Sequence, residues 1–349
     1  MKALTFLGVE SVAVENIPDP QILAPSDVIV RVDVCAVCGS DLHVYHGRET
    51  GIDHHTVMGH EFSGTIVEKG SAVGKLKKGD RVMSPFTTNC GECFYCLRGL
   101  TCRCIKGQLF GWVQEGSGLH GGQAEYVRVP MAEQTLVPIP EDLDMELAVL
   151  LGDIVPTGFF SARQAQIKPG DVVAVVGCGP VGLMAILGAY HYGASRVFSI
   201  DKVKSRLDVA ADFGGESVYA DDSADLDKIL QATHGRGPDA VLEAVGSGSS
   251  VKLAFDLVRP GGTVSAVGVC TESAFPFSPV QAYNKNLTYR TGRCPARSMM
   301  TELLPLVLSE PEKFRKVITH RVSLHEGPAV YQQFAAREEG MLKVLLDPR

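Results

Sequence analysis

The pattern of apolar and polar positions changes along this chain of 349 residues. From Lys2 to about Val34 the two kinds of residue alternate in short runs, separated by the turn-forming segments IPDP and APSD. This predicts short antiparallel strands. From Asp171 onward, continuous apolar runs alternate with helix-like segments, which is typical of parallel strands covered on both faces. We therefore expect a β-rich N-terminal region followed by a doubly wound α/β region.

The strands of the second region are predicted at 172–176, 196–201, 217–220, 239–245 and 263–267. Helices between them are expected to end near Gly193, Phe213, Gly235 and Val258. Beyond about Leu287 the alternation stops, so we expect the tail to pack back onto the N-terminal domain. One further strand is predicted in the β-rich region, at 121–130.

The first of these parallel strands runs directly into a glycine-rich turn. GCGPVG places Gly177, Gly179 and Gly182 in the pattern G-x-G-x-x-G at the start of an apolar helix. In such a unit the glycines allow a tight turn, close approach of a pyrophosphate, and close packing of helix on strand, while the helix N-terminus supplies amide donors. Asp201 ends the next strand, where a carboxylate would accept hydrogen bonds from both ribose hydroxyls and repel a 2′-phosphate. The pattern predicts a dinucleotide site that prefers NAD to NADP, and we expect it to include Pro180, Val181, Val245 and Val267.

A cysteine-rich loop at 89–106 predicts a structural metal site. Its spacing, C-x2-C-x2-C-x7-C, can surround one tetrahedral Zn²⁺ with four thiolates, those of Cys90, Cys93, Cys96 and Cys104. Cys102 breaks this spacing and is left out. A redox CxxC motif would normally open a helix in a thioredoxin-like unit, which the pattern does not indicate. A nucleic-acid-binding zinc ribbon is disfavoured because the loop contributes only Arg98, Arg103 and Lys106.

A second, scattered group could form an open metal site. Its members are Cys38 in VCGSDLH, His60 and Glu61 in MGHEF, and Asp153 in LLGDIVPTG. A cysteine, a histidine and a carboxylate with water in the fourth position would make a Lewis-acidic zinc site. From spacing alone, the alternative that these are packed core residues stays open, and we expect Cys35 to be such a core thiol.

These motifs together carry a family resemblance. GHE, CGSDLH, the cysteine loop, and GCGPVG with Asp201 occur in the order and spacing of the zinc-dependent medium-chain alcohol dehydrogenases, which the chain resembles over nearly its whole length. Within that family it looks most like the short bacterial relatives of formaldehyde dehydrogenase, through GECFYCLRG, LLGDIVPTGFF and HEGPAVY. The resemblance implies a GroES-like catalytic domain formed by 1–153 and 288–349, and a Rossmann NAD-binding domain at 154–287.

The resemblance also implies roles for individual residues. Cys38, His60 and Asp153 would bind the catalytic zinc, although Asp153 replaces the family's commoner third cysteine. Glu61 would lie beside the metal or act as a transient ligand. Ser40 and His43 match the family's proton relay to solvent. Arg206 matches a cation near the adenosine ribose and phosphate, Phe86 matches a substrate-pocket aromatic residue, and Phe110 and Trp112 are weaker candidates for the same wall.

The implied activity is hydride transfer between an alcohol, or the corresponding aldehyde or ketone, and NAD, with two zinc ions per chain. Formaldehyde dehydrogenase, dismutase or polyol dehydrogenase activity is the alternative. A non-catalytic zinc- and NAD-binding protein would be expected to lack a ligand, and none is missing here. We expect a homodimer or homotetramer.

Composition narrows the setting. A formal net charge of −7 argues against a nucleic-acid partner. No apolar run approaches the roughly 18 residues of a membrane span, and MKALTFLGVE lacks a signal-peptide core. We therefore expect a cytoplasmic protein without a membrane partner, whose ten cysteines are metal ligands or buried thiols.

Overall fold

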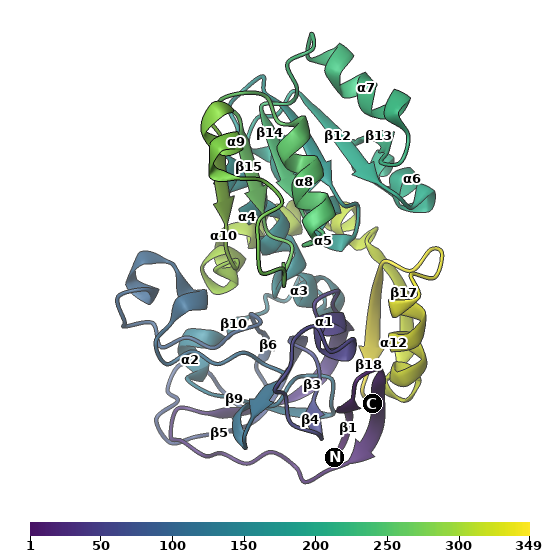
Figure 1. Cartoon of the computed structure of the whole chain (residues 1–349). Coiled ribbons are helices and arrows are strands. Elements are labelled where there is room, and N and C mark those ends of the chain that lie inside the picture. Colours follow the sequence, from purple (N-terminus) through teal and green to yellow (C-terminus); the bar gives the residue numbers. More distant parts are fainter. The chain divides into compact units, whose positions relative to one another are not determined.

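The computed structural model describes all residues from 1 to 349 and divides into two compact units (Figure 1). The first unit comprises Met1–Pro156 and Pro295–Arg349, and the second comprises Thr157–Cys294. The first unit is therefore made of two separate stretches of chain. Both ends of the chain belong to it.

The second unit contains a six-stranded, fully parallel sheet in the order β13-β12-β11-β14-β15-β16. The four strands at its centre, β12, β11, β14 and β15, are largely buried and mostly apolar, which explains why the apolar runs predicted them. The strand bounds are β11 (Val172–Val176), β12 (Arg196–Asp201), β13 (Glu216–Tyr219), β14 (Ala240–Glu243), β15 (Thr263–Ala266) and β16 (Thr288–Thr291).

The sixth strand corrects one expectation. β16 pairs in parallel with β15, so the strand–helix alternation continues past Leu287 instead of stopping there. The signal was weak because β16 is an edge strand with only partly buried or exposed residues, and its sequence TYRT has no apolar run. The parallel sheet thus extends beyond the boundary that the pattern indicated.

Helices connect these strands on the two faces of the sheet. The chain moves outward from β11 in one direction and from β14 in the other, and right-handed crossovers then place the two sets of helices on opposite faces. The helices are α5 (Pro180–His191), α6 (Lys204–Asp212), α7 (Ser223–Ala232), α8 (Gly248–Leu257) and α9 (Pro279–Asn284).

The first unit is built on a mixed seven-stranded sheet. Its path is β10-β6-β5-β3-β18-β17, and β9 also pairs with β3. β18 and β17 come from the far end of the chain, and β18 runs antiparallel to β3 with Val344 opposite Val37. The bounds are β3 (Val28–Val37), β5 (Glu61–Lys69), β6 (Arg81–Met83), β9 (Tyr126–Val129), β10 (Val137–Pro138), β17 (Ile318–Ser323) and β18 (Lys343–Asp347).

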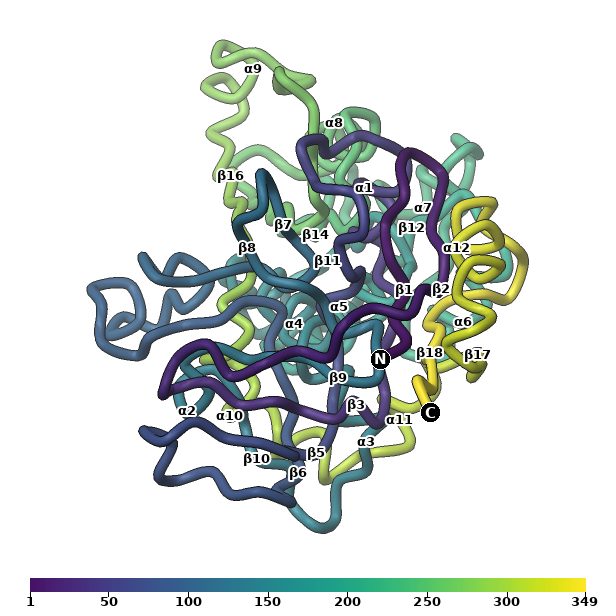
Figure 2. The backbone as a smooth tube through the Cα atoms, turned by 90° about the horizontal axis from the view of Figure 1, so that it is seen from below, coloured from purple at the N-terminus to yellow at the C-terminus, as the bar shows by residue number.

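Two smaller sheets and several short helices complete this unit. One sheet joins β1 (Lys2–Gly8), β2 (Ser11–Asn16) and β4 (Thr56–Val57), and the other joins β7 (Trp112–Gln114) and β8 (Ser117–Leu119). The helices are α1 (Asp41–Tyr45), α2 (Ala132–Thr135), α3 (Met145–Leu151), α10 (Ala296–Ser309), α11 (Pro311–Arg315) and α12 (Gly327–Ala335). Figure 2 shows the C-terminal α12 and β18 beside the N-terminal strands β1 and β2, so the chain from Pro295 onward packs onto the first unit.

One helical stretch is longer and more apolar than the others. α3 and α4 (Ile154–Ala165) join into a stretch of 21 residues, Met145–Ala165, with a mean hydropathy of 1.4 in its most apolar part. Its length and composition would suffice to cross a membrane, so the expectation that no apolar run approaches that length is wrong. However, 83% of that part is buried inside the protein, as in the core helix of a folded domain.

Candidate metal centre and nucleotide-binding loop

The scattered donors of the sequence converge at one end of the large sheet in the first unit. Cys38 follows the last residue of β3, and His60 directly precedes β5, which pairs with β3. Asp153 lies between α3 and α4, and Ser63 on β5 donates a hydrogen bond to the Met145 carbonyl, which ties this helical stretch to the sheet. Neighbouring strand ends and one helix junction therefore present these side chains to the same point.

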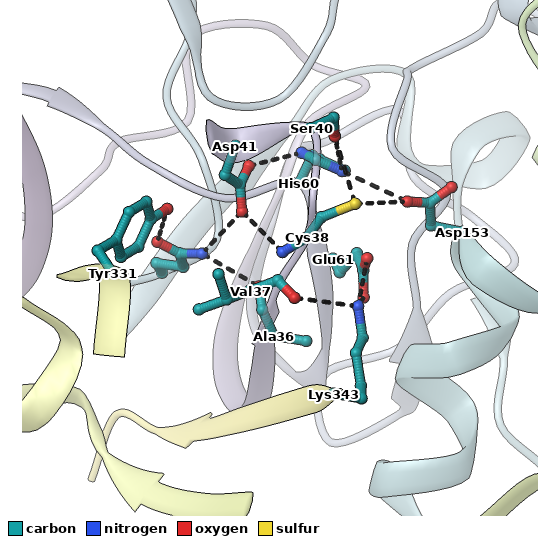
Figure 3. Close-up of polar contacts among 11 residues, drawn as sticks. Ala36, Val37, Cys38, Ser40, Asp41, His60, Glu61, Asp153, Tyr331 and Lys343 are labelled. Carbon is teal, nitrogen blue, oxygen red and sulfur yellow. Dashed lines mark hydrogen bonds and ion pairs between the residues drawn. The ribbon is translucent and has the colours of Figure 1, made fainter. Parts of the chain in front are cut away.

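The donor atoms of Cys38, His60, Glu61 and Asp153 all lie within 4.8 Å of one another. The Cys38 thiol donates to Asp153 Oδ2 at 3.3 Å, and His60 Nε2 lies 3.5 Å from the same oxygen (Figure 3). Burial, followed by the Asp153 charge, raises the pKa of the Cys38 thiol to about 11. A divalent cation would favour the thiolate here, because metal binding releases the thiol proton.

A buried hydrogen-bond network stands behind His60. Asp41, three residues after Cys38, places Oδ1 3.1 Å from His60 Nδ1 and accepts the Cys38 amide at Oδ2. Gln123 Nε2 donates to the same Oδ2 at 3.3 Å and to the Ala36 carbonyl. Figure 3 shows this network continuing to Tyr331. Burial lowers the pKa of His60, but the Asp41 charge and the hydrogen bonds outweigh it and raise the pKa well above its usual value.

Glu61 points toward the same centre and is held by a lysine from β18. Lys343 Nζ lies 2.6 Å from Glu61 Oε1 and also donates to the Val37 carbonyl at 3.2 Å. The side chains of both residues are essentially inaccessible to solvent, at 1% and 0% exposed. Burial raises the pKa of Glu61 to about 7, against the opposing effect of Lys343. Glu61 is thus one half of a buried ion pair and also a potential metal ligand.

Of the two residues expected in the proton relay, Ser40 lies next to these donors, and His43 follows it on α1. The Ser40 hydroxyl is 3.3 Å from Cys38 Sγ and 3.4 Å from His60 Nε2. His43 is only 9% exposed, and its Nδ1 is buried without a hydrogen-bond partner in the structure. Burial lowers its pKa below the ordinary value.

The three aromatic candidates for the substrate wall separate in the structure. Phe86 is buried with its ring edge-on to His60, 6.2 Å between ring centroids, and is therefore beside the metal donors. Phe110 instead packs edge-on to Phe62 in the hydrophobic core and is 1% exposed. Trp112 packs against that same core from β7. Phe110 is thus a core residue, which argues against its place in the pocket wall. Trp112 is only partly buried, so its place in that wall stays a prediction. Cys35 is a core thiol, as expected.

The cysteine loop folds into a compact lobe of two short 3-10 turns, at Cys96–Arg98 and Thr101–Arg103. The four expected sulfur atoms lie within 4.8 Å of one another. The Cys90 amide donates to Cys104 Sγ at 3.2 Å, and amide hydrogen bonds, first that of Cys96, lower the pKa of Cys93 to about 6. Amides that point at sulfur favour thiolates, the ligand form that zinc requires. Burial has the opposite effect and raises the pKa of Cys96 and Cys104, so these two thiols would lose their protons on binding a metal.

In the second unit, the glycine motif forms the turn between β11 and α5. Gly177 has φ of 95°, and a Cβ on Gly182 would lie 1.7 Å from the Gly177 carbonyl oxygen, so neither position tolerates a side chain. A Cβ on Gly179 would meet nothing closer than Arg206 Nη1, at 4.0 Å. The space in front of the Gly179 backbone is therefore open to a ligand, and the Arg206 guanidinium lies beside it. α5 begins at Pro180 with no side-chain cap, so its first amides lack that partner.

Asp201 ends β12 beside this turn. Its Oδ2 accepts the Cys178 amide at 2.7 Å and its Oδ1 accepts the Val203 amide at 2.9 Å, which fixes the carboxylate in place. Val245, which follows β14, is 45% exposed and approaches the Gly177 turn. Val267 directly follows β15 and is partly buried. These residues lie at the carboxyl ends of parallel strands, where open α/β sheets bind ligands.

Four residues of the metal-centre surroundings were not identified from the sequence: Asp41, Gln123, Tyr331 and Lys343. Asp41 could have been found, because it is an acid within the CGSDLH motif itself. The others could not, because Lys343 is 282 residues from Glu61 and Tyr331 is 208 residues from Gln123. The antiparallel pairing of β18 with β3 places Lys343 beside Glu61. The packing of the C-terminal segment places Tyr331 beside Gln123.

The donor chemistry of both clusters suits zinc. One offers four thiols, the set of closed structural sites, and the other offers a thiol, an imidazole and carboxylates, the mixed set of open catalytic sites. Together with a parallel sheet bearing a glycine-rich turn, they define a zinc-binding dehydrogenase. Two family models match accordingly: an alcohol dehydrogenase GroES-like domain over residues 24–141, and a zinc-binding dehydrogenase domain over residues 180–309.

Proteins similar to this chain are zinc-type or alcohol dehydrogenases. The chain is 41% identical to zinc-type alcohol dehydrogenase B of Aspergillus flavus, over 96% of this chain and 79% of that protein. Its structure matches alcohol dehydrogenase TADH from Thermus sp. ATN1 with a TM-score of 0.93 and 39% identity, over all of both chains. It also matches a putative zinc-binding dehydrogenase from Sinorhizobium meliloti 1021 bound to NADP, with a TM-score of 0.83 and 29% identity, over 99% of each chain. The chain belongs to the zinc-dependent medium-chain alcohol dehydrogenase family, and it is an alcohol oxidoreductase.

Proposed function

We propose that this enzyme transfers a hydride between an alcohol, or the corresponding aldehyde or ketone, and NAD, with two zinc ions per chain. The observation that carries the proposal is the convergence of Cys38, His60 and Asp153, from three separate segments, on one buried point. These three side chains would hold a zinc ion, which would supply Lewis acidity to lower the pKa of a substrate hydroxyl. The cysteine lobe holds the second ion in a structural role.

The surrounding residues prepare this reaction. Asp41 orients His60, and Lys343 neutralises Glu61, so the donors are held before substrate arrives. Phe86 supplies an apolar wall beside them. Ser40, next to the donors, takes the hydroxyl proton toward His43, whose lowered pKa keeps the imidazole neutral and able to accept it near pH 7.

The choice of NAD rests on Asp201. A fixed carboxylate accepts hydrogen bonds from a ribose diol, but it repels a 2′-phosphate. Arg206, beside Gly179, would face the cofactor's phosphates or adenosine ribose. One related structure is bound to NADP, so cofactor preference varies within the family and must be measured for this chain.

The direct test is a panel of primary, secondary and polyol alcohols and aldehydes with purified, zinc-loaded protein, monitored by NADH absorbance. We expect oxidation of at least one alcohol with NAD, and weaker activity with NADP. Asp201→Gly should narrow the difference between the two cofactors. Redox activity toward no alcohol or carbonyl compound would contradict the proposal, and equal kinetics with both cofactors would contradict the role of Asp201. Aldehyde dismutation without net NADH formation would favour the formaldehyde dismutase alternative.

The proposal also includes a cytoplasmic location and a homodimeric or homotetrameric assembly. Light scattering of the purified protein measures the assembly directly. A monomer at micromolar concentration would contradict that part of the proposal and leave the chemistry unaffected.

A further inference from the structure

A chain of buried polar side chains leads to the metal donors from the C-terminal part of the first unit. It begins at Tyr331 on α12, passes through Gln123 and Asp41, and ends at His60 (Figure 3). Tyr331 and Gln123 are fully buried and Asp41 is 5% exposed. A buried polar network reduces the stability of the fold unless each of its groups has a hydrogen-bond partner.

The direction of this network is determined by its chemistry. The Tyr331 hydroxyl donates to Gln123 Oε1 at 2.9 Å, so the amide nitrogen is directed the other way. There Gln123 Nε2 faces two acceptors, the Ala36 carbonyl at 3.0 Å and Asp41 Oδ2 at 3.3 Å. The reversed amide would set an oxygen against both acceptors and leave the tyrosine hydroxyl without its acceptor.

Asp41 transmits this orientation to the metal donors. Its Oδ2 accepts from Gln123 and from the Cys38 amide, which leaves Oδ1 facing His60 Nδ1 at 3.1 Å. A carboxylate only accepts, so Nδ1 carries a hydrogen, and once Nε2 gives up its own proton to a metal, the Nε2 lone pair faces Cys38 and Asp153. A metal ligand needs that tautomer.

We propose that Gln123 and Tyr331 are positioning residues for the mixed donor site, acting through Asp41 to fix the tautomer and ring direction of His60. They come from outside the ligand motifs, and Tyr331 lies 208 residues from Gln123, on a C-terminal segment that provides no ligand. This inference rests on the proposed metal site, since it describes how the site is held.

The test measures zinc affinity at the mixed site by graded chelator competition, with the zinc of the cysteine lobe as an internal reference. Three proteins carry Gln123→Met, Tyr331→Phe, or both substitutions. Tyr45→Phe is the matched control, because the Tyr45 ring packs 5.6 Å from that of Tyr331 but its hydroxyl is outside the network.

We expect Gln123→Met to weaken zinc binding at the mixed site about tenfold, within the range seen when the outer partners of metal ligands are lost. Tyr331→Phe should weaken it about fivefold, which corresponds to one neutral hydrogen bond. The double variant should match Gln123→Met alone, because Tyr331 acts only through the amide. Tyr45→Phe and the zinc of the cysteine lobe should be unaffected.

Other outcomes would overturn the inference. These are wild-type affinity in either single variant, equal weakening of both zinc sites, or losses that simply add in the double variant. If Gln123→Met does not fold, Tyr331→Phe alone decides, since it removes one atom and keeps the ring. A wild-type protein that holds zinc only at the cysteine lobe would instead refute the proposed function, and the inference would fall with it.

Discussion

The two clusters of metal donors in the first unit are built in opposite ways. The cysteine lobe takes its four thiols from a single loop between Cys90 and Cys104, and three of the four are only partly buried. The mixed site draws its donors from residues between 38 and 153, and its buried ion pair depends on Lys343. The lobe therefore depends on its metal for local order, whereas the mixed site depends on the fold for its geometry. Loss of the metal should unfold the first and leave the second folded but inactive.

The substitution Cys38→Ser tests whether the mixed site can lose its metal without unfolding, and it should have the largest effect on activity. We expect a folded protein that retains the zinc of the cysteine lobe and loses at least about 10³-fold in activity, because a Lewis-acid metal supplies several kcal/mol of transition-state stabilisation. Metal analysis, circular dichroism and steady-state kinetics measure the three effects. A fully metallated Cys38→Ser protein with normal turnover would contradict the catalytic assignment.

The substitution Cys96→Ser tests whether the cysteine lobe needs its metal to stay folded. Structural zinc sites contribute folding free energy directly, roughly 10–16 kcal/mol in small zinc-finger peptides, and one lost ligand should remove a fraction of that. We expect increased proteolysis within 89–106 and a lower thermal midpoint, with near-normal activity per correctly folded molecule. Unchanged protease resistance with only one zinc per chain would show that the lobe does not need its metal.

Lys343→Met tests how far the mixed site depends on the fold. Removing one partner of a buried ion pair leaves an uncompensated charge and typically costs about 3–5 kcal/mol. We expect that loss in the free energy of unfolding, measured by urea denaturation of metal-free protein at a pH well above the pKa of Glu61, where its carboxylate stays charged without the lysine. The matched control is Lys343→Met combined with Glu61→Gln, which should recover much of the loss. Equal stabilities of the single and double variants would show that the ion pair is not coupled.

The smallest expected effect is that of His43→Ala, which leaves both metal clusters intact. If His43 only accepts a proton from Ser40, alcohol oxidation should slow by roughly tenfold to 10²-fold without stopping. Burial lowers the pKa of His43. In the wild type, protonation of this imidazole should therefore slow alcohol oxidation only at a pH below the ordinary pKa of histidine. That limb of the pH–rate profile should disappear in the variant, and imidazole buffer should restore part of the rate. If zinc is lost from the mixed site instead, His43 is a ligand.

The sequence pattern predicted the features that depend on neighbouring residues, and it did not predict those that depend on contacts between distant residues. Val172–Val176, the glycine turn and the cysteine loop are each specified within a few residues, and their structures agree with the pattern. The exposed edge strand Thr288–Thr291 has no apolar run and was missed. Phe110 was a weaker candidate for the pocket wall, because residue type and position alone do not show that its ring packs on Phe62. Lys343 and Tyr331 become visible only when the sheet is assembled.

The pairing of β18 with β3 has a consequence for biosynthesis. β18 is the last of the strands to leave the ribosome, whereas β3 and the cysteine lobe are made long before it. The lobe can thus capture its metal while the chain is still growing. Glu61 has to wait, without its lysine, until the final strand docks beside β3. A nascent chain halted before residue 343 would therefore contain all four thiols of the cysteine lobe, but its mixed donor cluster would hold a glutamate that still lacks its lysine.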